Sequence, residues 1–564
     1  MKSVKILMVV VIAVVGLNGK VNAQPPYWEW ARQAISISAN GFQEGWSITT
    51  DKFENVYITG FYYDTVTFGN YTFSCPNGSS YIYLVKYDSA GNIVWAWSSR
   101  GNGIGTAVGV ATDSFGNVFL TAEGDSLVFD NDTLNSNGSY NDIIIAKFNS
   151  SGHVLWAHII GSNSSQFTTS NQICSDAFGN SYITGEFESP SLTFGNQTIN
   201  NLGVGTLFLV KYDSSGNVIW LRNAGGINGE TIGYGVATDN NCDIYVTGGS
   251  YCPVTHFGND SIIASSNANE FFIAKYDSGG QILWVKNSTD TGTYCNGLWI
   301  TTDAFGNTYS TGYFQFAPVT FGSYTLPNSS YYYNFFIVKY DSIGNILWAK
   351  SSSGNAAEGY SIIADSCGNA YILGMIKDDS ASTTFDTITL QAPVGSTDPM
   401  FLVKYDSSGH AQFGYVFTSG GDDNNALALG KSGSIYITGD FEYNPFVIGQ
   451  DTLLNSNSTE LAFVAKLNNH PNCYSDGIPQ IKPQHSLLLS PNPFTTTTTL
   501  TLQGSYHNPS LFIYNLLGQE VRSIPVGTNT QVTINRERLA SGMYFYKLID
   551  ENKEVLGIGK MIVE

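Results

Sequence analysis

Short apolar runs recur along most of the chain, and glycine, asparagine, aspartate or serine bounds each of them. One set comprises residues 235–238 (GVAT), 244–248 (IYVTG), 271–276 (FFIAKY) and 282–286 (ILWVK). The runs are rich in β-branched and aromatic side chains, which is typical of strands. No helical period of useful length runs through this region. The pattern therefore predicts an all-β fold made of groups of four strands.

This four-strand set recurs seven times, with steps of 62 to 65 residues between equivalent positions. The anchors are Asp51, Asp113, Asp176, Asp239, Asp303, Asp365 and a degenerate Gly430, followed in each unit by Lys86, Lys147, Lys211, Lys275, Lys339, Lys404 and Lys466. A regular period of this length indicates a repeat architecture. A seven-bladed β-propeller with four-stranded blades fits better than a stacked β-solenoid, because radial closure leaves only short edges.

The two ends of the repeated region complement each other. Residues 27–31 (YWEWA) resemble the fourth strand of a unit without the three strands before it, and no fourth strand follows Lys466. We therefore expect the N-terminal strand to complete the last blade. The repeated lysine, which could alternatively line a pore, is expected to pair with the turn aspartate of its own blade.

At 564 residues the chain is too long for one ordinary domain. Basic residues and an apolar run precede a small-residue site between Ala23 and Gln24, which predicts a cleaved secretory signal peptide. We expect a signal peptide at 1–23, the propeller at 24–469, a linker at 470–486 and a small Ig-like β-sandwich at 487–564. The apolar run is short for a membrane span, so no transmembrane segment is expected in the mature chain.

The formal net charge of −20 comes largely from the turn aspartates. A basic groove for a phosphate backbone is therefore not expected, which argues against nucleic-acid binding. The D-S-S-G-N turns could be read as fragments of a calcium loop, but they lack its spaced oxygens and terminal glutamate. No cofactor is predicted, and structural calcium remains an unsupported alternative.

Seven cysteines are present, with no C-x-x-C pair and no histidine cluster that would indicate a metal site. Export permits disulfides. Cys252 follows the second strand of one unit and Cys295 precedes the first strand of the next, so we predict a disulfide between them. The remaining cysteines are interpreted as small buried hydrophobic residues.

The links between second and third strands vary at their tips, whereas the hairpin turns are nearly uniform. Binding usually lies on variable loops carried by a rigid scaffold, so the face with the variable links is the expected recognition surface. The candidates for stacking on a sugar or peptide are Tyr62, Tyr63, Tyr81, Tyr140, Tyr331, Tyr332 and Tyr333. The alternative, that each ring only packs its own loop, stays open.

No catalytic residues are predicted. The acidic pairs Glu123/Asp125, Glu186/Glu188 and Asp440/Glu442 follow second strands at equivalent positions, so they form a repeated feature and no unique dyad. The leading hypothesis is a non-catalytic extracellular binding or adhesion protein, with a glycan or protein ligand. The alternative is an extracellular polysaccharide hydrolase or lyase, which would need an asymmetric carboxylate pair near the axis.

Four ordered motifs mark the C-terminal region: residues 490–494 (SPNPF), 513–521 (IYNLLGQEV), 539–547 (LASGMYFYK) and 559–563 (GKMIV). Together they closely resemble the type A sorting domain of the type IX secretion system of Bacteroidetes-type bacteria. The resemblance implies recognition by that secretion machinery, passage across the outer membrane, and release from or attachment to the cell surface. An ordinary Ig-like binding module is the alternative.

Residues 27–469 resemble the bacterial β-propeller (SBBP-like) repeat family. The shared pattern is D-x-x-G-N-x-Y-x-T-G followed by F-x-x-K-Y-D-x-x-G-N-x-x-W. This resemblance implies the propeller fold. It transfers no functional residues, because the shared positions are structural.

Overall fold

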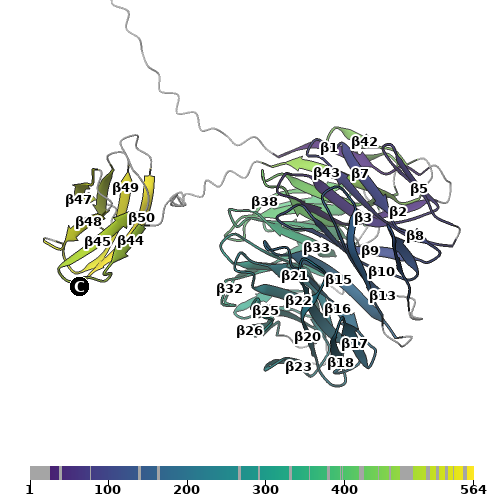
Figure 1. Ribbon diagram of the computed structural model, residues 1–564, viewed down its shortest axis with the longest axis horizontal. Coiled ribbons are helices and arrows are strands. Elements are labelled where there is room, and N and C mark those ends of the chain that lie inside the picture. Colours follow the sequence, from purple (N-terminus) through teal and green to yellow (C-terminus); the bar gives the residue numbers. More distant parts are fainter. Residues whose placement is uncertain are drawn as a thin grey trace, which may run out of the picture. The chain divides into compact units, whose positions relative to one another are not determined.

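The computed structural model describes residues 26–36, 41–76, 78–136, 142–161, 166–264, 269–289, 292–328, 333–354, 356–377, 382–393, 396, 398–417, 425–442, 444–455, 459–469, 487–502, 509–515, 520–527, 531–537, 539–549 and 555–564. These residues fall into two compact units, Met1–Asn472 and Cys473–Glu564 (Figure 1). Within the described ranges the secondary structure is strand without helix, which confirms the all-β prediction. No helix there could span a membrane.

The described part of the first unit contains seven antiparallel sets of four strands, which we call repeat sheets 1 to 7. Five of these sets are separate sheets, and two belong to six-stranded sheets that also include a hairpin of the following repeat. Sheet 1 comprises β2 (Phe42–Thr50), β3 (Val56–Tyr63), β6 (Tyr81–Tyr87) and β7 (Ile93–Ser98), and sheet 2 comprises β9 (Gly105–Thr112), β10 (Val118–Gly124), β13 (Asp142–Phe148) and β14 (Val154–Ile160). Sheet 3 comprises β15 (Thr168–Ser175), β16 (Ser181–Phe187), β19 (Thr206–Tyr212) and β20 (Val218–Gly225), and sheet 4 comprises β21 (Thr231–Thr238), β22 (Ile244–Ser250), β25 (Glu270–Tyr276) and β26 (Ile282–Asn287).

The remaining repeat sheets follow the same order. Sheet 5 comprises β27 (Tyr294–Thr302), β28 (Thr308–Gln315), β31 (Asn334–Tyr340) and β32 (Ile346–Gly354), and sheet 6 comprises β33 (Ala357–Ala364), β34 (Ala370–Ile376), β37 (Met400–Tyr405) and β38 (Ala411–Phe417). Sheet 7 comprises β39 (Ala426–Leu429), β40 (Ile435–Phe441), β43 (Leu461–Asn468) and β1 (Tyr27–Gln33). The first strands β2, β9, β15, β21, β27, β33 and β39 pack neighbour to neighbour, and β39 and β40 pack against β2.

Strand β1 supplies the fourth strand of repeat sheet 7. It pairs antiparallel with β43, from Tyr27 opposite Asn468 to Gln33 opposite Phe463. The predicted use of the N-terminal strand is therefore confirmed. The last strand of sheet 7 comes from the start of the chain, so the sheet joins two segments that are far apart in sequence.

A small hairpin, which the strand prediction did not resolve, lies between the second and third strands of each repeat sheet in the described residues. The hairpins are β4 (Thr65–Phe68) with β5 (Tyr71–Ser74), β11 (Leu127–Phe129) with β12 (Asp132–Leu134), β17 (Ser191–Phe194) with β18 (Gln197–Asn200), β23 (Val254–Phe257) with β24 (Asp260–Ile263), β29 (Val319–Phe321) with β30 (Tyr324–Leu326), β35 (Ser382–Phe385) with β36 (Ile388–Gln391), and β41 (Phe446–Ile448) with β42 (Asp451–Leu453). Some of them pair with the preceding repeat: β11 pairs with β8 (Arg100–Gly101), β23 with β20, and β35 with β32. They therefore link neighbouring repeat sheets.

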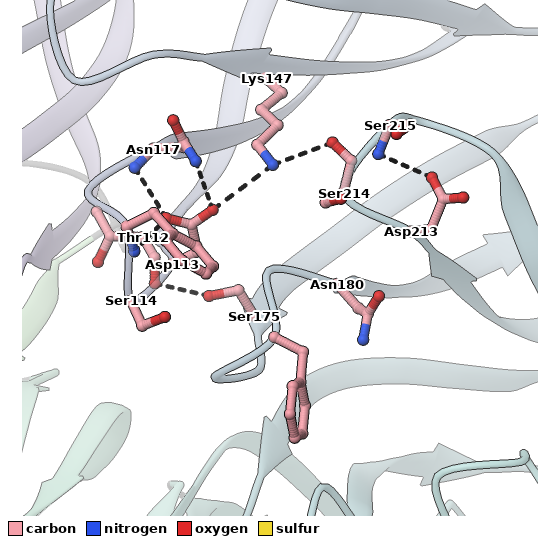
Figure 2. Close-up of polar contacts among 12 residues, drawn as sticks. Thr112, Asp113, Ser114, Asn117, Lys147, Ser175, Asn180, Asp213, Ser214 and Ser215 are labelled. Carbon is pink, nitrogen blue, oxygen red and sulfur yellow. Dashed lines mark hydrogen bonds and ion pairs between the residues drawn. The ribbon is translucent and has the colours of Figure 1, made fainter.

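A repeated contact between lysine and serine joins adjacent repeat sheets (Figure 2). Lys147 Nζ lies 3.5 Å from the Asp113 carboxylate of its own sheet and donates a hydrogen bond to the carbonyl of Ser214 in the next sheet, at 3.1 Å. Trp156 Nε1 donates to the same carbonyl at 3.4 Å. Lys275 and Lys339 likewise lie within 4 Å of their own turn aspartates. The predicted pairing is confirmed for these three lysines.

The contact between adjacent repeat sheets also requires a glycine in the turn that accepts these hydrogen bonds. Gly152 has φ of 85° and lies on the ring of Trp95 from the preceding sheet, where an added Cβ would be 2.9 Å from the indole. Only glycine combines this backbone conformation with so close an approach. Trp95 of one repeat and Gly152 of the next therefore form one interface.

The second unit consists, in its described residues, of two antiparallel sheets. One contains β44 (Leu487–Ser490), β45 (Thr497–Leu502) and β48 (Gln531–Asn535), and the other β47 (Glu520–Pro525), β46 (Ser510–Tyr514), β49 (Gly542–Ile549) and β50 (Val555–Val563). Leu500, Leu511, Ile534 and Leu548 are fully buried between them. Alternating buried and exposed residues along β45 and β48 match a sheet with one face on a core.

The predicted disulfide between Cys252 and Cys295 is wrong, because both residues are thiols. Cys252 Sγ donates to the carbonyl of Gly226 at 3.3 Å, while Cys295 is buried in β27 opposite Phe314. Cys252 is thus a buried residue between β22 and β23, and Cys295 is part of a hydrophobic core cluster. Cys367 is disulfide-bonded.

Candidate ligand-binding site

The first strands of the repeat sheets carry a β-bulge at one shared position. The pairing register shifts around Trp46, Val108, Asn171, Tyr234, Leu298 and Tyr360, and Asn425 occupies the equivalent position before β39. A bulge leaves one residue unpaired and re-aims its side chain. These seven residues and Trp299 line one cavity of about 190 Å³, at the place where the first strands meet.

A second cavity of about 500 Å³ lies over repeat sheets 4 to 6, and we call it the tyrosine cavity. Its lining residues are Tyr234, Leu298, Tyr313, Tyr333, Ala356, Glu358, Tyr360 and Lys377. Tyr234, Leu298 and Tyr360 line the smaller cavity as well. The lining comes from the first halves of first strands, the end of β28, and the residues that precede β31 and β33 or follow β34. These segments lie on the predicted recognition face.

The polar groups of the tyrosine cavity are held by neighbours on the same sheet. The Tyr360 hydroxyl donates a hydrogen bond to the Glu358 carboxylate, two residues earlier on β33. Lys377 Nζ lies 5.7 Å from the centroid of the Tyr360 ring and 3.9 Å from the Asp398 carboxylate. An acceptor and a donor of opposite charge therefore line one aromatic-walled space.

A row of tyrosine rings extends from the cavity toward repeat sheet 4. Tyr333 packs edge-on against Tyr313 with centroids 4.8 Å apart, Tyr313 stacks on Tyr294 at 6.3 Å, and Tyr294 meets Tyr251 at 5.6 Å. Asn296 Nδ2 donates to the Tyr313 hydroxyl at 3.1 Å. The ring contacts and this hydrogen bond fix the orientation of Tyr313 before any ligand arrives.

Burial raises the pKa of Tyr234 and of Tyr313 well above the ordinary value of a phenol. The charges of Glu186 and Glu230 raise the pKa of Tyr234 further, and that of Glu358 acts on Tyr313. Both hydroxyls stay protonated throughout the physiological range, so both can donate hydrogen bonds to a ligand.

The carboxyl groups of Glu186 and Glu230 lie near each other at Gly205, where an added Cβ would be 3.2 Å from an oxygen of each. Glu186 lies on β16 and Glu230 immediately precedes β21, so the pair joins repeat sheets 3 and 4. Burial raises the pKa of Glu186 to about 8, assisted by the charge of Glu230. The pair retains one proton near neutral pH, because two adjacent carboxylates disfavour each other's ionisation.

The structure separates the predicted tyrosine candidates. Tyr333 lines the tyrosine cavity, whereas Tyr62 and Tyr81 are buried, with 0% and 4% of their surface exposed. Strands β3 and β6 continue through these two positions and direct their rings into the core, so they cannot stack on a ligand. Tyr63 is 41% exposed and contacts Phe42 and Phe61, away from the cavity lining. Tyr140, Tyr331, Tyr332 and the Ala23–Gln24 site lie outside the described residues.

The acidic residues singled out in the sequence share one structural position. Glu123, Glu186 and Asp440 are each the second-last residue of a second strand, in β10, β16 and β40. They lie on the strand rather than after it. The described residues contain no group of three or more histidine, cysteine or acidic side chains suited to a metal ion.

Sequence reasoning missed Tyr234, Tyr313, Glu358, Tyr360 and Lys377. The predicted first strand at 235–238 began at the recurring apolar run and omitted the four residues before it, which include the bulge. A signal was present: the tripeptides E-G-W at 44–46 and E-G-Y at 358–360 occupy equivalent positions in units 1 and 6. At this position the repeats vary in side chain while their spacing stays constant.

Residues 489–564 match the family described as secretion system C-terminal sorting domain. This finding supports the predicted sorting function of the second unit. The sorting domain indicates export, with a secreted or outer cell-surface location, and implies interaction with the secretion machinery.

An uncharacterized WD repeat-containing protein of Acanthamoeba polyphaga mimivirus is 29% identical over 343 residues. The match covers 49% of this chain and 24% of that relative, so the chain spans about a quarter of the relative's length. WD repeats are propeller repeats, which agrees with the repeat architecture.

Solved structures with detectable similarity include a fungal alcohol oxidase of the AA5 family in complex with copper, at a TM-score of 0.35 and 12% identity, covering 95% of this chain and 99% of that one. The extracellular domain of a putative one-component system from B. thetaiotaomicron reaches a TM-score of 0.18 and 10% identity, covering 95% and 100%. Likeness at these TM-scores carries no inference about activity.

Proposed function

We propose that this chain is a non-catalytic extracellular binding or adhesion protein, exported by the type IX route, whose ligand binds in the tyrosine cavity. In this proposal the seven repeat sheets are the blades of a β-propeller at 24–469 that follows a signal peptide at 1–23. A linker at 470–486 precedes an Ig-like sorting domain at 487–564. The ligand is an extracellular glycan or protein that presents flat or ring-shaped groups to the tyrosines.

This proposal is supported mainly by the lining of the tyrosine cavity, whose side chains differ from those at the equivalent positions of other repeat sheets. The shared bulge position holds tyrosine in sheets 4 and 6, whereas the equivalent residues include Val108 and Asn171 in sheets 2 and 3. Structural positions such as the lysine anchor are the same in each unit, because each unit needs the same interface. A variable position on a rigid scaffold is where recognition is expected. The volume of about 500 Å³ falls within the roughly 300–1,000 Å³ of ligand pockets.

The test is a binding screen of the full-length exported chain on arrays of extracellular glycans and immobilised matrix proteins. The Tyr313→Ala variant removes a ring from the cavity, and Tyr63→Ala removes an exposed ring outside it. We expect Tyr313→Ala to lose the bound ligand and Tyr63→Ala to keep it. Equal binding by both variants, or no ligand on either array, would overturn the proposal.

An enzyme that cleaves polysaccharide is the second candidate, favoured by the asymmetric Glu186–Glu230 pair beside Tyr234. A glycosidase holds its two carboxyl groups at the scissile bond, about 5–5.5 Å apart in retaining enzymes and about 6.5–9.5 Å apart in inverting ones. Glu186 and Glu230 line neither of the two cavities described above, which supports the non-catalytic proposal. The unaltered chain would be an enzyme if it released shorter saccharides from a bound glycan and Glu186→Gln did not. That result would favour the second candidate over the first.

A further inference from the structure

Resting on the proposed function, we infer that the tyrosine cavity selects an uncharged saccharide, with Glu358 and Lys377 together holding neighbouring hydroxyl groups of one sugar ring. The charges that line the cavity, its aromatic walls and its extent support this selectivity.

The lining contains one carboxylate and one ammonium, so their charges offset each other. Glu358 is 5% exposed, and its carboxylate is held by the Tyr360 hydroxyl. Lys377 is held over the Tyr360 ring, with its ammonium near Asp398. Each sugar hydroxyl can donate a hydrogen bond to a carboxylate and accept one from an ammonium. A pair of adjacent hydroxyls therefore satisfies Glu358 and Lys377 at once.

A saccharide of either charge has a group of the same charge close to it in this cavity. A uronic acid or sulfated sugar placed against Lys377 brings its negative charge close to Glu358 and to Asp398, whose carboxylate lies 3.9 Å from that ammonium. An amino sugar placed against Glu358 shares the cavity with the Lys377 ammonium. Since like charges in a partly buried site are costly, either kind of charge lowers affinity.

The walls of the cavity fit the rest of a sugar ring. Tyr234, Tyr313, Tyr333 and Tyr360 present aromatic surface with hydroxyl groups at the ring edge. Aromatic side chains bind the apolar C–H face of a flat ligand, while phenol groups contribute hydrogen bonds. The protonated hydroxyls of Tyr234 and Tyr313 add two donors of no charge.

The tyrosine row suggests where the next sugar rings of a chain lie. Tyr313, Tyr294 and Tyr251 follow one another at centroid separations of 6.3 and 5.6 Å. The lining of the cavity comes from repeat sheets 4 to 6, and it shares Tyr234, Leu298 and Tyr360 with the smaller cavity. This arrangement fits the end of an oligosaccharide in the cavity and its following rings along the row.

The experiment compares four tetrasaccharide probes on the full-length exported chain by titration calorimetry. Cellotetraose and maltotetraose are neutral, tetragalacturonate is anionic and the chitosan tetramer is cationic below its amine pKa. We expect a neutral probe to bind at least tenfold more tightly than both charged probes, at low and at physiological salt. Tighter binding of either charged probe would overturn the inference, while leaving the proposed binding function in place.

Two substitutions test whether Glu358 and Lys377 bind the saccharide. Glu358→Gln and Lys377→Met each remove one charged hydrogen-bonding group, and each should weaken neutral-probe binding roughly 10-fold or more. Lys377→Met should also raise the affinity for the chitosan tetramer relative to the neutral probe. Glu442→Gln, on a side chain outside the cavity, serves as the control. Unchanged neutral-probe affinity in both variants would overturn the inference.

The four-probe comparison on the unaltered chain decides the question even if a variant fails to fold. Binding of immobilised protein alone, with no saccharide, would overturn this inference but not the proposed function.

Discussion

Lys466 Nζ donates a hydrogen bond to the carbonyl oxygen of Ser89 at 3.1 Å, across 377 residues of sequence. The indole of Trp30 donates to the same oxygen at 3.1 Å. Equivalent lysine and tryptophan pairs join consecutive repeat sheets, so sheets 7 and 1 meet through the interface used elsewhere in the repeats. The stability of the first unit should depend on this contact as on the others.

Replacing Trp30 by alanine should lower the free energy of unfolding by about 3–5 kcal/mol, because a large buried ring and its hydrogen bond are both lost. Urea unfolding followed by circular dichroism measures the effect. Phe53→Ala is the control, since Phe53 is 66% exposed. Equal stability of the two variants would show that β1 contributes nothing to sheet 7.

Asp113 and Asp213 form the same kind of turn but differ in burial and partner (Figure 2). Both accept hydrogen bonds from two backbone amides, but only Asp113 also faces the Lys147 ammonium, at 3.5 Å. Asp113→Ala leaves a buried lysine without its counter-charge and should cost about 3–5 kcal/mol. Asp213→Ala should cost about 1 kcal/mol. Thermal unfolding of both variants tests the difference, and a larger loss in Asp213→Ala would contradict it.

Stability should fall as the pH rises toward 8. The folded protein raises the pKa of Glu186 from 4.5 to about 8, so it binds this proton more tightly than the unfolded chain does. The proton-linked stabilisation is complete below about pH 4.5 and is lost as the pH rises through about 8. Melting temperatures at pH 6 and pH 8.5 should therefore differ. Glu186→Gln should reduce the difference and Glu442→Gln should not; an unchanged slope in Glu186→Gln would contradict the assignment.

Removing residues 489–564 should keep the chain from reaching the cell surface, because these residues match the sorting domain. Cell fractionation with antibody detection in a host with the secretion system measures the location. The Tyr313→Ala variant should be exported as the unaltered chain is, since it changes only the first unit. Surface delivery of the truncated chain would contradict the role of this segment.

The repeat sheets could be predicted because each interface needs the same residues. Lys147, Trp156 and the turn of Asp113 recur at a constant spacing, and each has a short-range structural reason. The hydrogen bond from Lys147 to Ser214 was not predictable in the same way. It crosses to the next sheet, and a single repeat does not show which carbonyl its neighbour presents.

The tyrosine cavity was only partly predictable, since its residues come from six short segments of repeats 4 to 6. Tyr333 was found through the variable link that contains it. Tyr234 and Tyr360 were missed because a bulge places them, and a bulge interrupts the strand alternation by which strands are recognised. Tyr62 was misassigned because its loop-like neighbours conceal that β3 continues through it.

Because β1 belongs to repeat sheet 7, this sheet can be completed only after the end of the repeated region has been synthesised. The ribosome produces Tyr27–Gln33 at the start of the repeated region, yet their partner Leu461–Asn468 is the last strand of that region to be made. The backbone of β1 therefore has no partner strand until Leu461–Asn468 has been made. A chain that ends before Leu461 lacks β43, so repeat sheet 7 cannot form and β1 has no partner strand.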